Sequence, residues 1–119
     1  MQAFMSQILA AAAGGAIGAA GRLAFLKVGL SGAAGILALN VAGSFGLGLA
    51  LALLEGRPAW LIVFVGAGIF GGLTTFSSFA GDAVRLLTEA PMQGVAYIAA
   101  SVMFAVAAFA VGSWIGRAL

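Results

Sequence analysis

The stretch Ile69-Phe70-Gly71-Gly72-Leu73-Thr74-Thr75-Phe76-Ser77-Ser78-Phe79 decides the fold, because it lies in the middle of an apolar run long enough to cross a membrane. Two adjacent glycines and a Thr-Thr pair weaken a helix at this point. A backbone that leaves helical geometry inside a bilayer must be buried in protein or face water or an ion. Since interrupted helices at membrane depth mark ion and substrate sites in transport proteins, the stretch predicts a transport function.

The composition predicts a membrane protein with little outside the bilayer. Of the 119 residues, 64% are hydrophobic and 7% are charged, whereas a soluble domain carries about 25% charged residues. Four charge-free runs each exceed the roughly 18 apolar residues that suggest a spanning helix. They are Met1–Gly21, Val28–Leu54, Pro58–Gly81 and Ala90–Gly116. We therefore expect an all-α membrane protein, with a single four-helix transmembrane domain over residues 1–119.

The expected spans cover about Phe4–Phe25, Ala33–Leu54, Ala59–Leu87 and Met92–Trp114. The first lacks a basic n-region and leads into further spans, so we expect a retained helix and not a signal peptide. As one helix the third would reach roughly 43 Å, at about 1.5 Å per residue, against a hydrocarbon core of about 30 Å. This excess fits a third helix that is broken near Gly71–Thr75.

Several function classes are disfavoured by what the chain lacks. With no cysteine there is no disulfide or thiolate metal site, and with no histidine the commonest general base and metal ligand is missing. A metabolic enzyme is therefore the least expected class. A net charge of +2 is too small for a nucleic-acid footprint, so we expect no nucleic-acid partner.

Glycine spacing predicts close helix packing. The pairs Gly14/Gly18 and Gly112/Gly116 have the small-xxx-small spacing that lets helices approach closely. Ordinary packing explains any one pair, but together they favour a crowded bundle. Four short helices enclose little volume, so a transport pathway is more easily built between subunits, and we expect an oligomer.

The basic residues are almost evenly divided between the two membrane faces. An even number of spans places both termini and the Glu55–Pro58 turn on one face, which leaves three basic residues opposite two. The first set is Arg22, Lys27 and Arg85, and the second is Arg57 and Arg117. Lys/Arg excess normally fixes orientation. Two interpretations stay open: a single topology set by weak cues, or insertion in both orientations, which allows an antiparallel dimer.

Polar side chains within the spans are candidate functional groups, because they are costly in a bilayer. The side-chain amide of Asn40 is expected either to form an interhelical hydrogen bond or to face an anion as a hydrogen-bond donor. Tyr97 and Ser101 are four residues apart on one helical face, and Ala105 continues that face without a hydroxyl. The stretch from Ile69 to Phe79 carries four hydroxyls, which either form hydrogen bonds to their own helices or line a transport pathway. They belong to Thr74, Thr75, Ser77 and Ser78.

Phe76 and Phe79 are three residues apart and project from nearby parts of one face. Such a pair in a membrane helix usually contacts lipid or core. However, aromatic rings have a positive edge, which can approach an anion without a full charge that would trap it. Ring edges together with a track of hydroxyls and an amide would suit a small anion, since conduction needs binding that is weak enough to release.

Three motifs together resemble the fluoride channel family, Fluc, also called CrcB. They are Gly71-Gly72-Leu73-Thr74-Thr75-Phe76-Ser77-Ser78-Phe79, Asn40-x-x-Gly43-Ser44-Phe45 and Gly15-x-x-Gly18-Ala19-x-x-Arg22. The resemblance implies a dual-topology antiparallel homodimer with two pores, in the lipid bilayer of a bacterial inner membrane. It implies passive export of fluoride from the cytoplasm. It also implies a structural sodium ion at the dimer centre, held by backbone carbonyls from both subunits.

The resemblance also assigns roles to residues. The sodium-binding carbonyls would be those of Gly71 and Thr74, and Arg22 and Asp82 would belong to the vestibules. The anion pore would comprise Asn40, Thr75, Phe76, Ser77, Ser78, Phe79, Tyr97 and Ser101. The chain departs from the common family pattern at four positions: Leu23 for an aromatic residue, Ser78 for Thr, Asp82 for Glu and Ala105 for Ser.

A second interpretation is a proton-coupled small multidrug exporter, which also has four spans. That mechanism needs a membrane-embedded carboxylate, whereas spans one, two and four contain none and Asp82 lies near a span end. A third is a scaffold subunit without transport, which would not need a polar helix break beside two phenylalanines. Fluoride flux from proteoliposomes separates the three.

Overall fold

The computed structural model describes all residues 1–119, and every regular element is helical. Four segments are long and apolar enough to cross a membrane: Gln2–Val28, Gly32–Leu53, Ala59–Glu89 and Pro91–Ala118. They agree with the expected spans to within a few residues at each end. Only 17 of 119 residues are buried, and large apolar side chains are exposed along the helices. Such a surface suits lipid as the solvent, so this is a multi-pass membrane protein.

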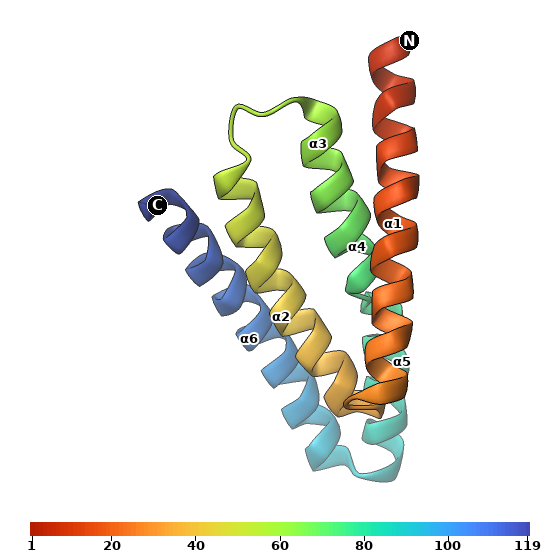
Figure 1. Cartoon of the computed structure of the whole chain (residues 1–119). Coiled ribbons are helices and arrows are strands. Elements are labelled where there is room, and N and C mark those ends of the chain that lie inside the picture. The colour runs from red at the N-terminus through yellow and green to blue at the C-terminus, as the bar shows by residue number, and fades with distance from the viewer.

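The elements follow one another through short connections. Helix α1 (Gln2–Val28) precedes α2 (Gly32–Leu53), and the long final helix is α6 (Pro91–Ala118). Between α2 and α6 lie α3 (Ala59–Val63), a π-helix η1 (Phe64–Phe70), α4 (Gly71–Leu73) and α5 (Phe76–Glu89). Both termini and the Leu54–Pro58 connection lie at the same end of the molecule (Figure 1).

Glycine and proline set the helix boundaries. Gly32 opens α2 with φ +64° and Gly56 turns the chain with φ +79°, a backbone region that other residues rarely adopt. Pro58 directly precedes α3, and Pro91 is the first residue of α6, where its missing N–H leaves no helical bond unmade. These residues explain why the sequence pattern located the connections well.

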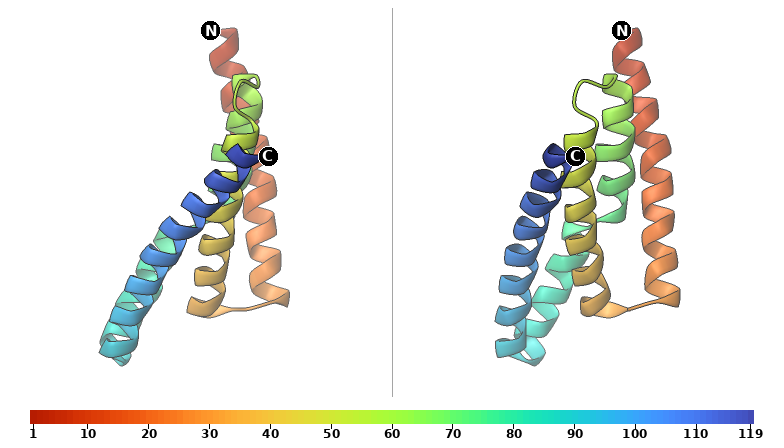
Figure 2. Two further views of the ribbon diagram at one scale, coloured as in Figure 1. Left: turned by 90° about the vertical axis from the view of Figure 1, so that its left-hand side faces the viewer. Right: turned by 60° about the vertical axis from the view of Figure 1, so that its left-hand side comes forward.

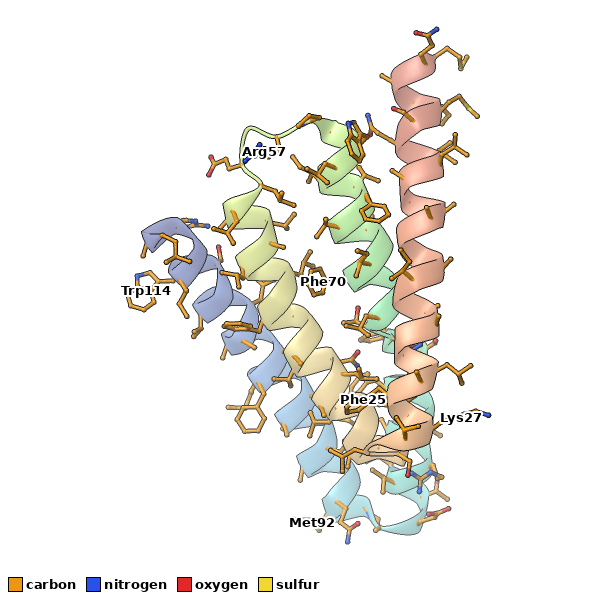
Figure 3. The ribbon with its side chains drawn as sticks, in the orientation of Figure 1. Phe25, Lys27, Arg57, Phe70, Met92 and Trp114 are labelled. Carbon is orange, nitrogen blue, oxygen red and sulfur yellow. The ribbon has the colours of Figure 1, made fainter.

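The helices form two closely packed pairs. Helix α6 runs along α2, and α1 runs along η1 and α4, as Figure 1 and both views of Figure 2 show. Helix α5 packs against α6 on the side away from the termini. A small core joins α2, α5 and α6 there; it consists of Ile36, Phe79, Ala83 and Tyr97. Side chains such as Lys27, Met92 and Trp114 project outward from the bundle in Figure 3.

Glycines make both pairs close. A methyl group added to Gly14 would lie 2.8 Å from the Gly68 Cα, and one added to Gly68 would lie 2.8 Å from the Gly14 Cα. On the other pair, a methyl group on Gly48 or Gly112 would meet backbone atoms of the opposite helix at 3.0 Å and closer. The predicted glycine motifs are therefore used within one chain, with backbone against backbone.

Two residues interrupt the helical backbone between Ala59 and Glu89. After α4 ends at Leu73, Thr74 and Thr75 are extended, with ψ of 156° and 116°, and α5 begins at Phe76. The preceding turns are already wide, because η1 is a π-helix, a form found frequently at functional sites. The interruption places the backbone groups of Thr74 and Thr75 beside α1 and α2, where they form hydrogen bonds with side chains of those two helices.

Candidate functional site

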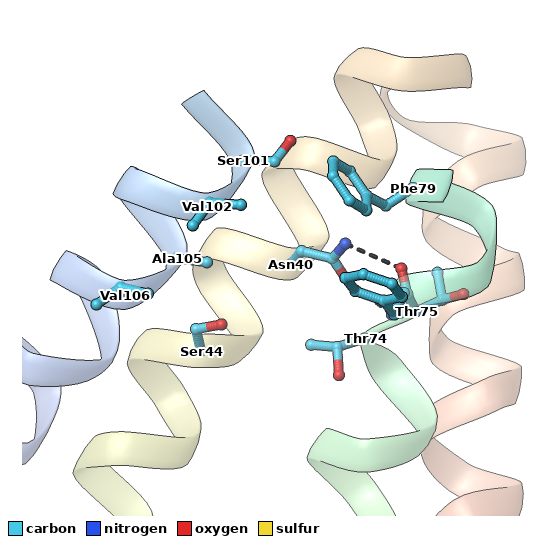
Figure 4. A pocket seen from close by; sticks show the side chains of 10 residues that line it. Asn40, Ser44, Thr74, Thr75, Phe79, Ser101, Val102, Ala105 and Val106 are labelled. Atoms are coloured by element: carbon cyan, nitrogen blue, oxygen red, sulfur yellow. Dashed lines mark hydrogen bonds between the residues drawn. The ribbon is translucent and has the colours of Figure 1, made fainter. Parts of the chain in front are cut away.

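A cavity of about 310 Å³ adjoins the interruption (Figure 4). Its walls come from α2, the two extended residues, the start of α5 and the middle of α6. None of its lining residues is charged; they are Asn40, Ser44, Thr74, Thr75, Phe76, Phe79, Ser101, Val102, Ala105 and Val106. In the sequence these residues were related only as members of one motif or of one helical face. The structure brings them together around one cavity.

Asn40 holds the interruption in place. Its Oδ1 accepts from the Thr75 N–H at 2.8 Å, and its Nδ2 donates to the Thr75 carbonyl at 3.0 Å. Because the backbone N–H can only donate and the carbonyl can only accept, this pair fixes which way the amide faces. The interhelical bond expected as one option is present. One of the two Nδ2 protons remains free, on a residue that lines the cavity.

Thr75 also begins α5. Its Oγ1 accepts from the Ser78 N–H at 3.2 Å, which caps one of the open donors of the first turn. The same oxygen lies 3.2 Å from both Ser77 Oγ and Ser78 Oγ. Ser77 and Ser78 are exposed and do not line the cavity, so the structure places these two predicted pore hydroxyls beside the cap.

Three aromatic rings follow one another from the cavity into the core. The rings of Phe76 and Phe79 have centroids 5.2 Å apart at an interplanar angle of 53°, and Phe79 lies 5.5 Å from Tyr97. Phe76 is 78% exposed, whereas Phe79 is 8% exposed. Both phenylalanines line the cavity with their rings tilted against each other, and the exposed Phe76 is free to contact another molecule.

Two buried hydroxyls next to this row have no hydrogen-bond partner. They are Tyr97 Oη and Ser101 Oγ, on one face of α6. An unpaired buried hydroxyl costs free energy, and native structures rarely leave one without a reason. Ser101 lines the cavity while Tyr97 does not, so the pair leads from the cavity into the core.

The two carbonyls predicted to hold sodium have different surroundings. The Thr75 N–H bonds to Asn40, so it is unavailable to the carbonyl of Gly71 four residues earlier, its normal helical acceptor. The Thr74 carbonyl accepts from Arg22 Nη1 at 3.2 Å. A carbonyl has two lone pairs, so each of these oxygens retains acceptor capacity for a hard cation.

Asp82 lies outside the cavity. Its carboxylate is 3.4 Å from Arg85 Nη2, and Arg85 Nη1 is 3.3 Å from Glu89 Oε2. The three charges alternate along one side of α5. No group of three acidic, histidine or cysteine side chains forms a metal site in this chain, so a bound cation would depend on neutral oxygens of the backbone or of side chains.

Sequence reasoning missed Ser44 as a candidate, and Val102 and Val106 as cavity walls. The signal for Ser44 was present, since it lies four residues after Asn40 and so on the same face of α2. The two valines carry no chemical signal in a sequence that is mostly apolar.

Fold and site together define the class of this protein: a four-helix membrane protein with an uncharged cavity, lined by polar and apolar side chains, at a helix interruption. Residues 9–113 match the family described as CrcB-like protein, Camphor Resistance (CrcB). The chain therefore belongs to the CrcB-like family.

Individual relatives cover almost the same length. A protein of Mesorhizobium japonicum named Fluoride-specific ion channel FluC is 38% identical over 97% of this chain and 99% of its own. Proteins with the same name from Chelativorans sp. and Rhizobium meliloti are 39% and 36% identical, again over 97% of this chain and 99% of theirs.

Proposed function

We propose that this chain is a fluoride-selective ion channel that passively exports fluoride from the cytoplasm. The observation that carries the proposal is the cavity, where neutral donors and two phenylalanine rings adjoin a helix interruption. Neutral donors and ring edges attract a small anion yet hold it less firmly than Lys or Arg would, as conduction requires. The names of the relatives support fluoride as that anion.

Asn40, Phe76, Phe79 and Ser101 are proposed as the groups that contact the anion. Thr75, Ser77, Ser78 and Tyr97 complete the path by supplying hydroxyls next to the cavity. The unpaired hydroxyls of Tyr97 and Ser101 support this assignment, because a passing anion would give each of them a partner. Arg22 and Asp82 would act at the vestibules.

The active form proposed is an antiparallel, dual-topology homodimer with two pores and a broken third helix at membrane depth. Phe76 supports it, because a pore ring that is 78% exposed in one chain needs a second surface to enclose the path. The nearly even distribution of basic residues between the faces supports insertion both ways. The bacterial relatives support a bacterial inner membrane.

A structural sodium ion between the two interruptions is also proposed. The carbonyls of Gly71 and Thr74 from both chains would hold it, and bound there it would join the subunits through electrostatic attraction. Carbonyl oxygen is the ligand that such hard cations take, and each carbonyl has a lone pair to offer. Gly71 is exposed, which leaves room for a partner chain to approach.

The exporter alternative is not favoured. The acid nearest to the cavity, Asp82, is paired with Arg85 and does not line the cavity. A proton-coupled mechanism would need that carboxylate free to exchange protons with a substrate.

The test is fluoride efflux from liposomes that contain the purified protein, followed with a fluoride electrode. Rapid efflux without any imposed proton gradient, and with chloride retained, is the expected result. Efflux that requires a proton gradient would support the exporter, and absence of any fluoride movement would contradict the channel.

A further inference from the structure

One wall of the cavity offers no polar side chain beyond Ser101. On that side α6 contributes Val102, Ala105 and Val106. In Figure 4 these residues continue along α6 from Ser101 toward the level of Ser44. An anion moving along this wall would exchange hydroxyl and amide donors for hydrocarbon alone, at a high cost in free energy.

The adjoining wall, formed by α2, does carry donors at this level. Asn40 and Ser44 are four residues apart, so both point from one face of α2, and both line the cavity. Figure 4 shows Ser44 beside Ala105, with its hydroxyl on the side that faces Thr74 across the cavity. The hydroxyl missing from α6 at position 105 is therefore matched by one on α2.

The Ser44 hydroxyl is also free to bind. The Thr74 hydroxyl donates to the Phe70 carbonyl at 2.8 Å, and the Thr75 hydroxyl is joined to Ser77 and Ser78. By contrast, the half-buried Ser44 hydroxyl takes part in none of the side-chain hydrogen bonds of the chain. Serine in a helix often bonds back to a carbonyl of the preceding turn, so this free hydroxyl is notable.

We propose that Ser44 is an anion-binding residue, which continues the donor path from Asn40 and Ser101 past Ala105. The proposal rests on the proposed channel function and deepens it, because it assigns part of the path to α2. A hydroxyl donates to fluoride without a positive charge, so it holds the ion without trapping it.

The first experiment compares Ser44→Ala with Ser6→Ala in liposome efflux. Loss of one hydrogen bond to a charged ligand should lower fluoride efflux about tenfold in Ser44→Ala. Ser6 is the matched control, because its hydroxyl is bonded to the Ala3 carbonyl at 2.8 Å, outside the cavity. Ser6→Ala should keep the wild-type rate.

The second experiment moves the hydroxyl from α2 to α6. In Ser44→Ala/Ala105→Ser the lost donor returns on the neighbouring helix, and efflux should recover to within about threefold of wild type. If Ser44→Ala does not elute as folded protein in size exclusion, the near-isosteric pair Ser44→Thr and Ser44→Val replaces it, with efflux expected to be about tenfold slower in Ser44→Val than in Ser44→Thr.

The outcomes separate this inference from the function on which it rests. Unchanged efflux in Ser44→Ala, or a folded double variant that stays as slow as Ser44→Ala, would overturn the role of Ser44 while the channel function stands. A wild-type protein that passes no fluoride would instead overturn the channel function, and the role of Ser44 with it.

Discussion

The side-chain amide of Asn40 pairs with the backbone of Thr75 as one strand pairs with another, through hydrogen bonds of 2.8 and 3.0 Å. The pair satisfies the Thr75 N–H, which the interruption removes from the helical ladder, and adds a hydrogen bond to the carbonyl of the residue that caps α5. It also fixes the amide, so that its remaining N–H has a defined direction. The structure of the interruption and the proposed anion binding thus depend on the same side chain.

Replacing Asn40 by leucine should therefore affect stability as well as flux. Asn40→Leu keeps the branched shape of the side chain but leaves the Thr75 N–H unpaired, which should lower the free energy of unfolding by about 2 kcal/mol. Unfolding in mixed micelles of increasing SDS content measures the change. The control is Leu39→Met at the preceding buried position, which should lower the free energy of unfolding by less than Asn40→Leu does. Equal stability of Asn40→Leu and wild type would show that the pair contributes nothing.

The two phenylalanines should respond differently to substitution by isoleucine. Each of Phe76→Ile and Phe79→Ile should reduce fluoride efflux severely, because isoleucine has no positive ring edge. Phe79 is 8% exposed and packs on Tyr97, so Phe79→Ile should also lower stability, whereas the exposed Phe76→Ile should not. Efflux and SDS unfolding of both variants give the comparison. Undiminished efflux in both would remove the rings from the path.

Adjacent glycines in α1 provide a matched pair for the helix contact. Gly14→Ala would place a methyl group 2.8 Å from the Gly68 Cα, whereas Gly15→Ala meets nothing within 4 Å. Gly14→Ala should lower the free energy of unfolding by about 1–3 kcal/mol through overpacking. Gly15→Ala should raise it by about 0.5–1 kcal/mol, since alanine favours a helix. Similar effects of the two changes would contradict the backbone contact between α1 and η1.

A substitution at Gly71 tests the proposed sodium ion. Within one chain a methyl group there would lie 3.6 Å from the nearest atom, the Gly66 carbonyl oxygen, so Gly71→Ala should leave the chain folded. The bulkier Gly71→Leu should prevent two interruptions from approaching each other, and so prevent dimers. Thr74→Ser keeps the backbone ligands and should behave as wild type. Size exclusion measures the oligomeric state.

Sodium removal completes this test. Long dialysis into sodium-free buffer should weaken the dimer and abolish efflux, and lithium or potassium should restore them poorly, because carbonyl geometry and cavity size set the fit. Unchanged dimer and efflux after dialysis, with no ion between the interruptions in a dimer structure, would contradict the ion.

The charge distribution makes topology easy to bias. Two lysines added to the Glu55–Pro58 turn should fix one orientation, and that variant alone should lose efflux for want of an oppositely oriented partner. A second copy with lysines added near Lys27 should restore efflux on coexpression. Full activity of either biased variant alone would favour a parallel assembly.

Much of this architecture could be predicted from the sequence, because the lipid environment restricts the possibilities. Charge-free runs located all four apolar segments, and Pro58, Pro91 and the glycines located the connections. The order of packing could not be predicted. Small-xxx-small spacing is compatible with contacts inside or between chains, and the structure uses Gly14, Gly18, Gly112 and Gly116 inside one chain.

The site was predictable where polar residues are rare and unpredictable where they are common. Asn40 carries the only side-chain amide of its span, so its importance was visible, but its partner Thr75 depends on how two distant segments fold together. Among the clustered hydroxyls, sequence alone could not tell Thr74, which bonds back to Phe70, from Thr75, which caps α5. Ser44 was overlooked because a serine in a helix is ordinarily satisfied by its own backbone.

The cavity has a consequence for biosynthesis. A newly inserted chain without its proposed partner would present Phe76 and the adjoining cavity to acyl chains, which cannot satisfy the amide and hydroxyl groups of that cavity. In the proposed antiparallel dimer, unassembled copies would then be the least stable form in the membrane and the first to be degraded. Turnover of copies without a partner would by itself equalise the numbers of the two proposed orientations.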